Sequence, residues 1–254
     1  MRRRYNFGFP LEHQVTFNFL ADSIEVPCFL KSNLLGDNFG LLVHRKVLEK
    51  YGDDMKKSYS TGELTPQYMV AVNQVFEELT DGKVRIATQA DAERLRNLGR
   101  EKNGLNYNVC ATVFSGFVLR SVEGSNRELA DRLRWEARNV GMVISEAPIV
   151  FWLKDLRQKK LGEYYLKEGT KPFYAEILGE DLIDKYGCFL TEDVDPETGL
   201  PTKLNPRGIT RTLLNSRTGV CGLLSFLNTG QIFSDLDKFD ALGKILLVSN
   251  EEAA

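Results

Sequence analysis

The segment NYNVCATVFSGFVLR, residues 106–120, decides the fold class because it is the strongest strand signal in the chain. Apolar residues occupy both alternating sets of positions along it, so neither face of the strand is polar. This pattern is typical of a strand that lies inside a sheet whose two faces are both covered. We therefore expect residues 106–120 to form a central strand.

Helices with clear start and stop signals flank this strand. Proline at the first helical position, Pro66, begins one helix, and Gly82 ends it. Thr88 and Asp91 match the capping box that opens a second helix, which we expect to end before Gly99. Ser125 and Glu128 would be the box of a third helix, closed by Gly141. That makes three amphipathic helices with predicted ends.

The remaining segments add more strands and helices without a strict alternation. Strands are expected at 83–87, 142–153 and 244–249, a hairpin at 13–30, helices at 154–169 and 172–187, a strand or a helix at 219–227, and a short helix from Ser234. Interspersed strands and helices of this kind favour an α+β fold with a mixed, mainly antiparallel sheet. We expect one domain over residues 1–254, with a weakly marked boundary near 122–125 as the alternative.

The predicted helix at 125–141 carries an unusual outward face. Steps of 100° per residue place Leu129, Leu133, Ala137 and Val140 on one stripe. Trp135 falls opposite that stripe, and Asp131 and the arginines lie on the same outward side, which gives the candidate binding residues Trp135, Arg127, Arg134 and Arg138. Tryptophan and arginine are enriched at protein interfaces, and both also bind nucleic acids. A third alternative is that another segment of this chain covers the tryptophan.

A proline-rich loop at 191–208, TEDVDPETGLPTKLNPRG, is the second candidate contact region. The segments DPETG and NPRG each combine a proline and a glycine at the positions that turns favour. The acidic residues do not form a calcium loop, because Thr198 stands where an EF-hand needs glycine. We expect two turns joined by an extended piece, which is either an arm that reaches another chain or a long surface loop. The candidate contacts are Pro196, Leu200, Pro201, Leu204 and Pro206.

Composition and motifs exclude several functional classes. The formal net charge is −2, so no overall positive field attracts nucleic acid. Four cysteines without a CxxC pair indicate buried thiols, and two histidines are too few for a typical zinc site. No phosphate-binding or nucleophile motif occurs, so we expect no cofactor and no metal. The absence of a long apolar segment predicts a soluble, non-secreted protein that lies in the cytoplasm or within an assembly.

These observations favour a non-enzymatic structural or adaptor subunit of a larger multiprotein assembly, such as a virus or phage particle. Its partners would be other protein chains. The first alternative is a protein that binds or processes nucleic acid through the arginine and tryptophan face. The second alternative is an enzyme with a metal bound by carboxylates, for which Glu180, Asp181 and Asp184 are the nearest candidates. Solvated helix charges explain these residues without any metal and are the favoured interpretation.

Overall fold

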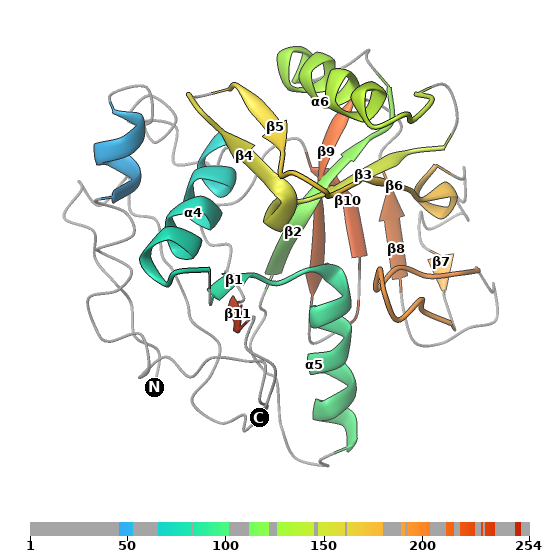
Figure 1. Ribbon diagram of the computed structural model, residues 1–254. Helices are drawn as coiled ribbons and strands as arrows, with labels where there is room; N and C mark the ends of the chain where they lie inside the picture. Colours follow the sequence, from blue (N-terminus) through green and yellow to red (C-terminus); the bar gives the residue numbers. More distant parts are fainter. Residues whose placement is uncertain are drawn as a thin grey trace.

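The computed structural model describes residues 46–52, 66–82, 84–101, 112–121, 126–144, 147–160, 162–179, 189–190, 193–203, 212–215, 219–226, 230, 232–236 and 247–249. The predicted hairpin at 13–30 lies outside these residues, as do Cys28, Cys110 and Cys188. A mixed sheet forms the centre of the described part (Figure 1). The α+β class predicted from the sequence is confirmed.

The main sheet has seven strands in the order β6-β3-β2-β9-β10-β8-β7. All neighbouring pairs are antiparallel except β10 and β8, which are parallel. The strands are β2 (Thr112–Leu119), β3 (Ile149–Trp152), β6 (Phe173–Tyr174), β7 (Phe189–Leu190), β8 (Thr212–Asn215), β9 (Val220–Phe226) and β10 (Ile232–Leu236). The segment at 219–227, open to either interpretation in the sequence, is thus a strand.

Strand β2 is covered on both faces, as its apolar sequence predicts. It pairs with β3 on one side and with β9 along its whole length on the other. Phe117 packs into the core on one face of the sheet and Val118 into a separate core on the other. Gly116 allows β3 to approach closely, because a Cβ there would lie 2.1 Å from the carbonyl oxygen of Phe151.

Two helices and a hairpin cover the first face of the sheet. Helix α4 (Pro66–Leu79) and helix α6 (Arg127–Asn139) both contribute to the core that contains Phe117. The hairpin of β4 (Leu156–Gln158) and β5 (Tyr164–Leu166) lies between them in Figure 1, with β4 contacting α4 and β5 contacting α6. The side chains that fill this layer stabilise it by about 25 cal/mol for each Å² of apolar surface removed from water.

The second face is covered by shorter elements. The 3-10 helix η3 (Glu176–Leu178) supplies Ile177 and Leu178, which pack against Val118 and Trp152 of the sheet. A second 3-10 helix, η2 (Leu153–Asp155), leads from β3 into β4. The other described elements are helix α5 (Gln89–Glu101), the pair of β1 (Val84–Ile86) with β11 (Leu247–Ser249), and a helical segment at 46–51.

The predicted start of α5 is confirmed atom by atom. The backbone N–H of Asp91 donates to Thr88 Oγ1 over 3.3 Å, and the N–H of Thr88 donates to Asp91 Oδ2 over 2.8 Å. Burial alone would raise the pKa of Asp91, but hydrogen bonds and charge from Arg85, with the bonds from Thr88, hold that pKa below its usual range. The helix then continues through Gly99, which the sequence predicts to follow its end, to Glu101.

Four local predictions are wrong, for identifiable reasons. The segment at 154–169 is η2 and the β4–β5 hairpin instead of a helix, with Gly162 at a φ of 84° in the turn between the two strands. The described part of 172–187 is β6 and η3 instead of a helix. Asn126, at a φ of 60° and without a side-chain cap, is the N-cap of α6, so Ser125 is not. Ser234 lies in β10, where Arg120 binds it.

No helix in the described part of the chain is long and apolar enough to span a membrane.

Candidate functional site

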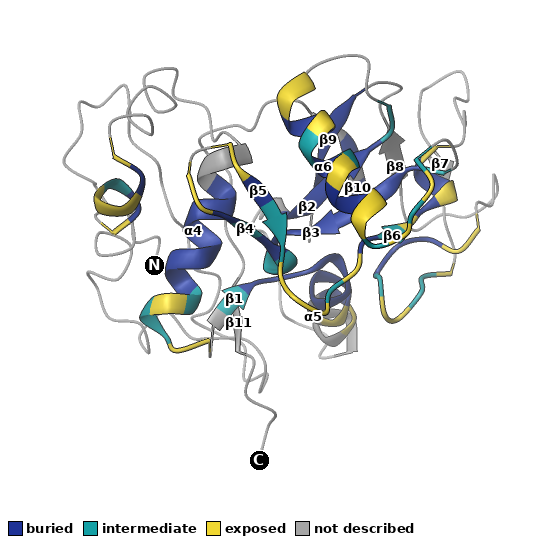
Figure 2. Ribbon diagram, turned by 45° about the horizontal axis from the view of Figure 1, so that its top comes forward, coloured by how far each residue is buried: buried dark blue, intermediate teal, exposed yellow. Residues whose placement is uncertain are grey.

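Helix α6 buries one face and exposes the other, as Figure 2 shows in blue and yellow. The buried residues are Leu129, Ala130, Leu133, Glu136 and Ala137. The helix ends as predicted: Gly141 has a φ of 87°, and the N–H of Met142 donates to the carbonyl of Ala137 over 2.9 Å. This ending turns the chain away after residue 139 and leaves the outward face of α6 open to solvent.

Trp135 lies in the middle of that outward face. Its side chain is 51% exposed, so no segment of this chain covers it fully. It is one of three large hydrophobic residues that the described part of the chain exposes, with Val143 and Tyr174. Transfer of such a side chain out of water is favourable by a few kcal/mol, so its exposure in the isolated chain leaves that free energy available for binding.

Arg132 holds Trp135 from one side. Its guanidinium lies 4.3 Å from the centroid of the indole ring, within the range of a cation–π contact. The same guanidinium forms an ion pair of 2.6 Å with Glu136 and donates from Nε to the backbone carbonyl of Tyr164. Glu136 in turn accepts a hydrogen bond of 3.1 Å from the N–H of Leu166. The arginine is therefore fixed before any partner binds.

These contacts also cap the outer edge of β5. Residues 164 and 166 point their backbone polar groups away from β4, and an uncapped strand edge of this kind pairs readily with other strands. Arg132 and Glu136 occupy that edge in place of a further strand. Neither residue was predicted as functional from the sequence, since their role depends on a hairpin whose sequence predicts a helix. Their spacing of four residues on one helix face was the available signal.

The predicted arginines lie where the helical pattern puts them. Arg127 and Arg138 are exposed and Arg134 is half-buried, with its Nε atom buried and without a hydrogen-bond partner. No ion pair or hydrogen bond joins the side chains of these three residues to others that the structure describes. Asp131, on the same side, is exposed too. The outward face of α6 thus consists of Trp135 and charged side chains of both signs that have no ion-pair partner among the described residues.

The proline-rich loop folds back on its own chain in its described part, residues 193–203. Asp195 Oδ1 accepts hydrogen bonds of 2.7 Å from the N–H of Thr198 and 2.9 Å from that of Glu197, and these bonds, led by Thr198, lower the pKa of Asp195. Val194 and Pro201 form an antiparallel bridge. The first predicted turn is therefore present, closed by an aspartate as in other Asx turns.

Two of the predicted contact residues in this loop are buried within the chain. Leu200 is 3% exposed and packs into the second core, and Pro201 beside it is buried. Gly199, at a φ of 72°, touches the start of α5, where a Cβ would lie 2.4 Å from the N atom of Ala90. Pro196 is exposed, whereas Leu204 and Pro206 lie outside the described residues. Of the predicted contact residues that lie in the described loop, Pro196 alone is exposed.

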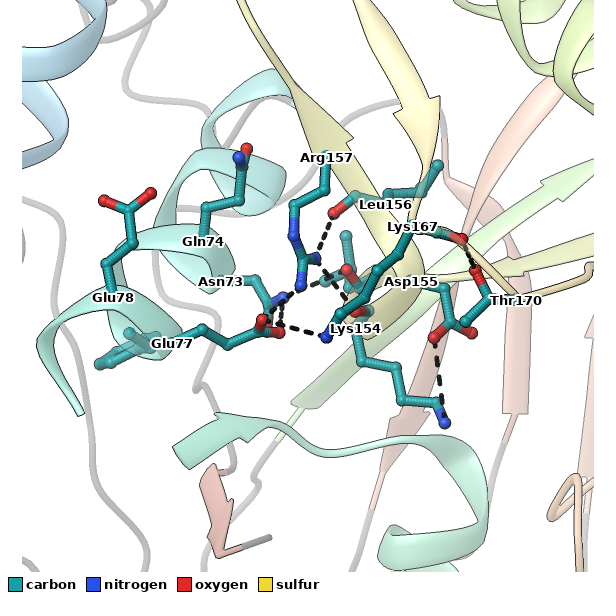
Figure 3. A network of polar contacts seen from close by, with 12 residues as sticks. Asn73, Gln74, Glu77, Glu78, Lys154, Asp155, Leu156, Arg157, Lys167 and Thr170 are labelled. Atoms are coloured by element: carbon teal, nitrogen blue, oxygen red, sulfur yellow. Dashed lines mark hydrogen bonds and ion pairs between the residues drawn. The ribbon is translucent and has the colours of Figure 1, made fainter. Parts of the chain in front are cut away.

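A polar network joins α4 to η2 and to the β4–β5 hairpin (Figure 3). Glu77 forms ion pairs with Arg157 and, over 3.6 Å, with Lys167. Asn73 donates to Glu77 Oε1 over 3.0 Å and to the carbonyl of Leu153 over 3.2 Å. Burial raises the pKa of neighbouring Asp155, against the opposing charge of Lys154 and other cations. Each carboxylate here has a cationic neighbour, which is typical of a structural network.

Nothing in the described part of the chain assembles the ligands of a metal ion. No group of three or more histidine, cysteine, aspartate or glutamate side chains gathers among the described residues. Cys221 is buried. The carboxylates considered for a metal, Glu180, Asp181 and Asp184, lie outside the described residues.

No protein-family model, no curated protein and no solved structure matches the chain. The outward face of α6 is therefore judged on its own chemistry.

Proposed function

We propose that this chain is a non-enzymatic structural subunit of a larger multiprotein assembly, and that it contacts another protein through the outward face of α6. The single observation that carries this proposal is the exposed Trp135 side chain. Truncation of a tryptophan at the centre of an interface commonly weakens the binding free energy by about 2 kcal/mol or more.

The fixed position of Arg132 supports the same proposal. A side chain that is already ordered loses little conformational freedom on binding, which lowers the cost of association. The Trp135–Arg132 pair is held by Glu136 and by the backbone of β5. A partner would therefore meet a preformed aromatic surface.

The charges of α6 favour protein over nucleic acid as the partner. Its sequence RELADRLRWEARN has four arginines and three acidic residues, a net charge of 4 − 3 = +1. A nucleic-acid surface gains its affinity mainly from several cations that neutralise phosphates, and acidic residues among them oppose it. Protein interfaces commonly combine an aromatic centre with a rim of both charges.

The test is the size of the particle that holds the chain in an extract of its source. We expect the tagged chain to elute well above its own mass of 28.8 kDa and Trp135→Ala to shift it towards that mass. Asn97→Ala, an exposed position on α5, is the matched control and should leave the elution unchanged. Elution of the unmodified chain as a free monomer, or equal elution of the Trp135→Ala variant, would overturn the proposal.

A second candidate function is nucleic-acid binding, favoured by the three arginines without ion-pair partners beside an exposed indole. Binding of this kind should weaken steeply with salt and should fall for Arg134→Ala. Nuclease treatment of the same extract separates the two functions, since it would shrink a nucleic-acid complex and leave a protein assembly intact.

A further inference from the structure

The centre of the outward face of α6 is a stripe of four exposed residues with symmetric spacing. Glu128, Asp131, Trp135 and Arg138 are separated by three, four and three positions, which keeps all four on one side of the helix. Because the spacing reads the same in both directions, a second copy of the helix placed antiparallel presents its stripe at matching levels. In this pairing Glu128 lies at the level of Arg138 of the other copy, and Asp131 lies at the level of its Trp135.

Its charges are self-complementary in the same orientation. Glu128 lies in the first turn of α6 and Arg138 lies in its last turn. An antiparallel copy brings Glu128 of each helix opposite Arg138 of the other, so that one contact yields two equivalent ion pairs. Neither side chain has an ion pair or hydrogen bond with a described residue of its own chain, which leaves both available.

Trp135 then occupies the middle of the contact. The two-fold axis would pass at the level of residue 133, midway between 128 and 138. Each Trp135 lies two residues from that level, which places the two side chains about 6 Å apart along the helix axes at a rise of about 1.5 Å per residue. That separation suits an offset pair of aromatic rings. Arg132, held by Glu136, remains on one face of each indole ring.

The other exposed apolar residues adjoin this stripe. Val143 follows the end of α6 by four residues, and its backbone exchanges hydrogen bonds of 2.7 and 2.9 Å with the hydroxyl of Tyr174. The exposed large hydrophobic residues found among those whose burial is described are thus Trp135 on α6, Val143 shortly after it and Tyr174 bound to Val143.

We infer that α6 pairs antiparallel with α6 of a second copy of this chain, in a two-fold symmetric dimer centred on Trp135. An isologous contact of this kind uses the same patch on both copies, as the stripe does. The inference rests on the proposed function and names the partner for its protein contact. Two short helices bury less than the roughly 800 Å² per partner of a standard interface. We therefore expect the dimer to have a dissociation constant on the order of micromolar.

The experiment exchanges the charges of the proposed ion pair in the purified full chain and measures dimerisation by sedimentation velocity from 1 to 100 µM. Glu128→Arg and Arg138→Glu should each weaken the dimer about tenfold or more, because each creates two like-charge contacts. An equimolar mixture of the two variants should restore the dimer to within about threefold, because every pair across the axis is then of opposite charge. The double variant should also restore it.

Two controls distinguish a loss of dimerisation from a loss of folding. Glu197→Arg makes the same charge reversal in the exposed turn of the proline-rich loop and should leave dimerisation unchanged. A thermal melt of each single variant shows that it is folded, and recovery in the mixture cannot arise from misfolded chains.

The outcomes separate this inference from the proposed function. A purified chain that stays monomeric at 100 µM overturns the dimer, as does a dimer that tolerates both charge reversals. If the chain in the extract still elutes at high mass in a manner that depends on Trp135, the protein contact stands and its partner is a different protein. If neither dimer nor larger particle forms, both proposals fail.

Discussion

Helices α4 and α6 pack on the same face of the sheet, on either side of the β4–β5 hairpin, yet they break the usual rule of burial in opposite ways. Helix α4 buries the polar side chains of Asn73 and Gln74, and both have hydrogen-bond partners inside the chain. Helix α6 exposes the apolar side chain of Trp135, which this chain leaves half uncovered. The burial of Asn73 and Gln74 is explained by hydrogen bonds within the chain. The exposure of Trp135 is explained only if another molecule covers it.

The two helices share one task. Gln74 of α4 accepts a hydrogen bond of 2.9 Å from the N–H of Gln158 and donates over 3.4 Å to its carbonyl, which caps the outer edge of β4. Arg132 and Glu136 of α6 cap the outer edge of β5. An isolated two-stranded hairpin is marginally stable, so these side-chain caps hold it as neighbouring strands would.

The largest effect on stability should come from the buried side of this comparison. Asn73→Leu leaves the N–H of Ile86 and the carbonyl of Leu153 buried without their partner. Each such group costs about 1–3 kcal/mol, so we expect the free energy of unfolding in urea to fall by about 2–6 kcal/mol. Asn97→Leu, the same change at an exposed position of α5, should change it by less than about 0.5 kcal/mol. Similar losses for the two variants would show that the network of Asn73 contributes little.

A smaller effect is expected from the edge cap on α6. Glu136→Ala removes the acceptor of the Leu166 N–H and the partner of Arg132, and should cost about 1–3 kcal/mol. Arg132→Ala should cost less, because its guanidinium is partly solvated and water replaces some of its bonds.

A double-mutant cycle of Arg132 and Glu136 in urea measures their coupling. We expect at least about 0.5 kcal/mol of coupling free energy. In the Arg132→Ala variant, the fluorescence anisotropy of the chain should also fall as the Trp135 side chain gains motion. Strictly additive losses with unchanged anisotropy would argue against a cap that also orders the tryptophan.

The smallest effect should have the opposite sign. The hydroxyl of Tyr164 is buried and lacks a hydrogen-bond partner, so Tyr164→Phe should leave stability unchanged or raise it by up to about 1 kcal/mol at neutral pH. Burial raises the pKa of Tyr164 above its ordinary value of 10.0. Above that pH the unfolded chain loses the phenolic proton first, which favours unfolding of the unmodified protein.

The advantage of Tyr164→Phe should therefore grow as pH rises from 9 to 11, which urea unfolding of both proteins at matched pH measures. Tyr51, whose pKa burial also raises, is present in both proteins and cancels in the difference. A variant that loses stability would mean that the hydroxyl has a partner, such as an internal water.

Local signals in the sequence found the elements whose ends are set by nearby residues. The capping box of Thr88 and Asp91 and the two-sided apolar pattern of β2 are both local, and both are confirmed. The helical pattern also placed Trp135 outward, where the structure has it. The β4–β5 hairpin was missed because side chains from α4 and α6, distant in the sequence, bind its backbone. The burial of Leu200 likewise depends on the second core, which no local pattern shows.

The edge caps on the hairpin carry a consequence for how this chain tolerates change. Gln74, Arg132 and Glu136 bind backbone groups, which every amino acid but proline presents alike. Substitutions of the exposed hairpin side chains should therefore accumulate freely, while a single inserted or deleted residue in β4 or β5 would turn the bound groups to the wrong side. The helices thus fix the register of the hairpin, and the freedom to change is confined to the side chains exposed at its turn, such as Lys159, Lys160 and Glu163.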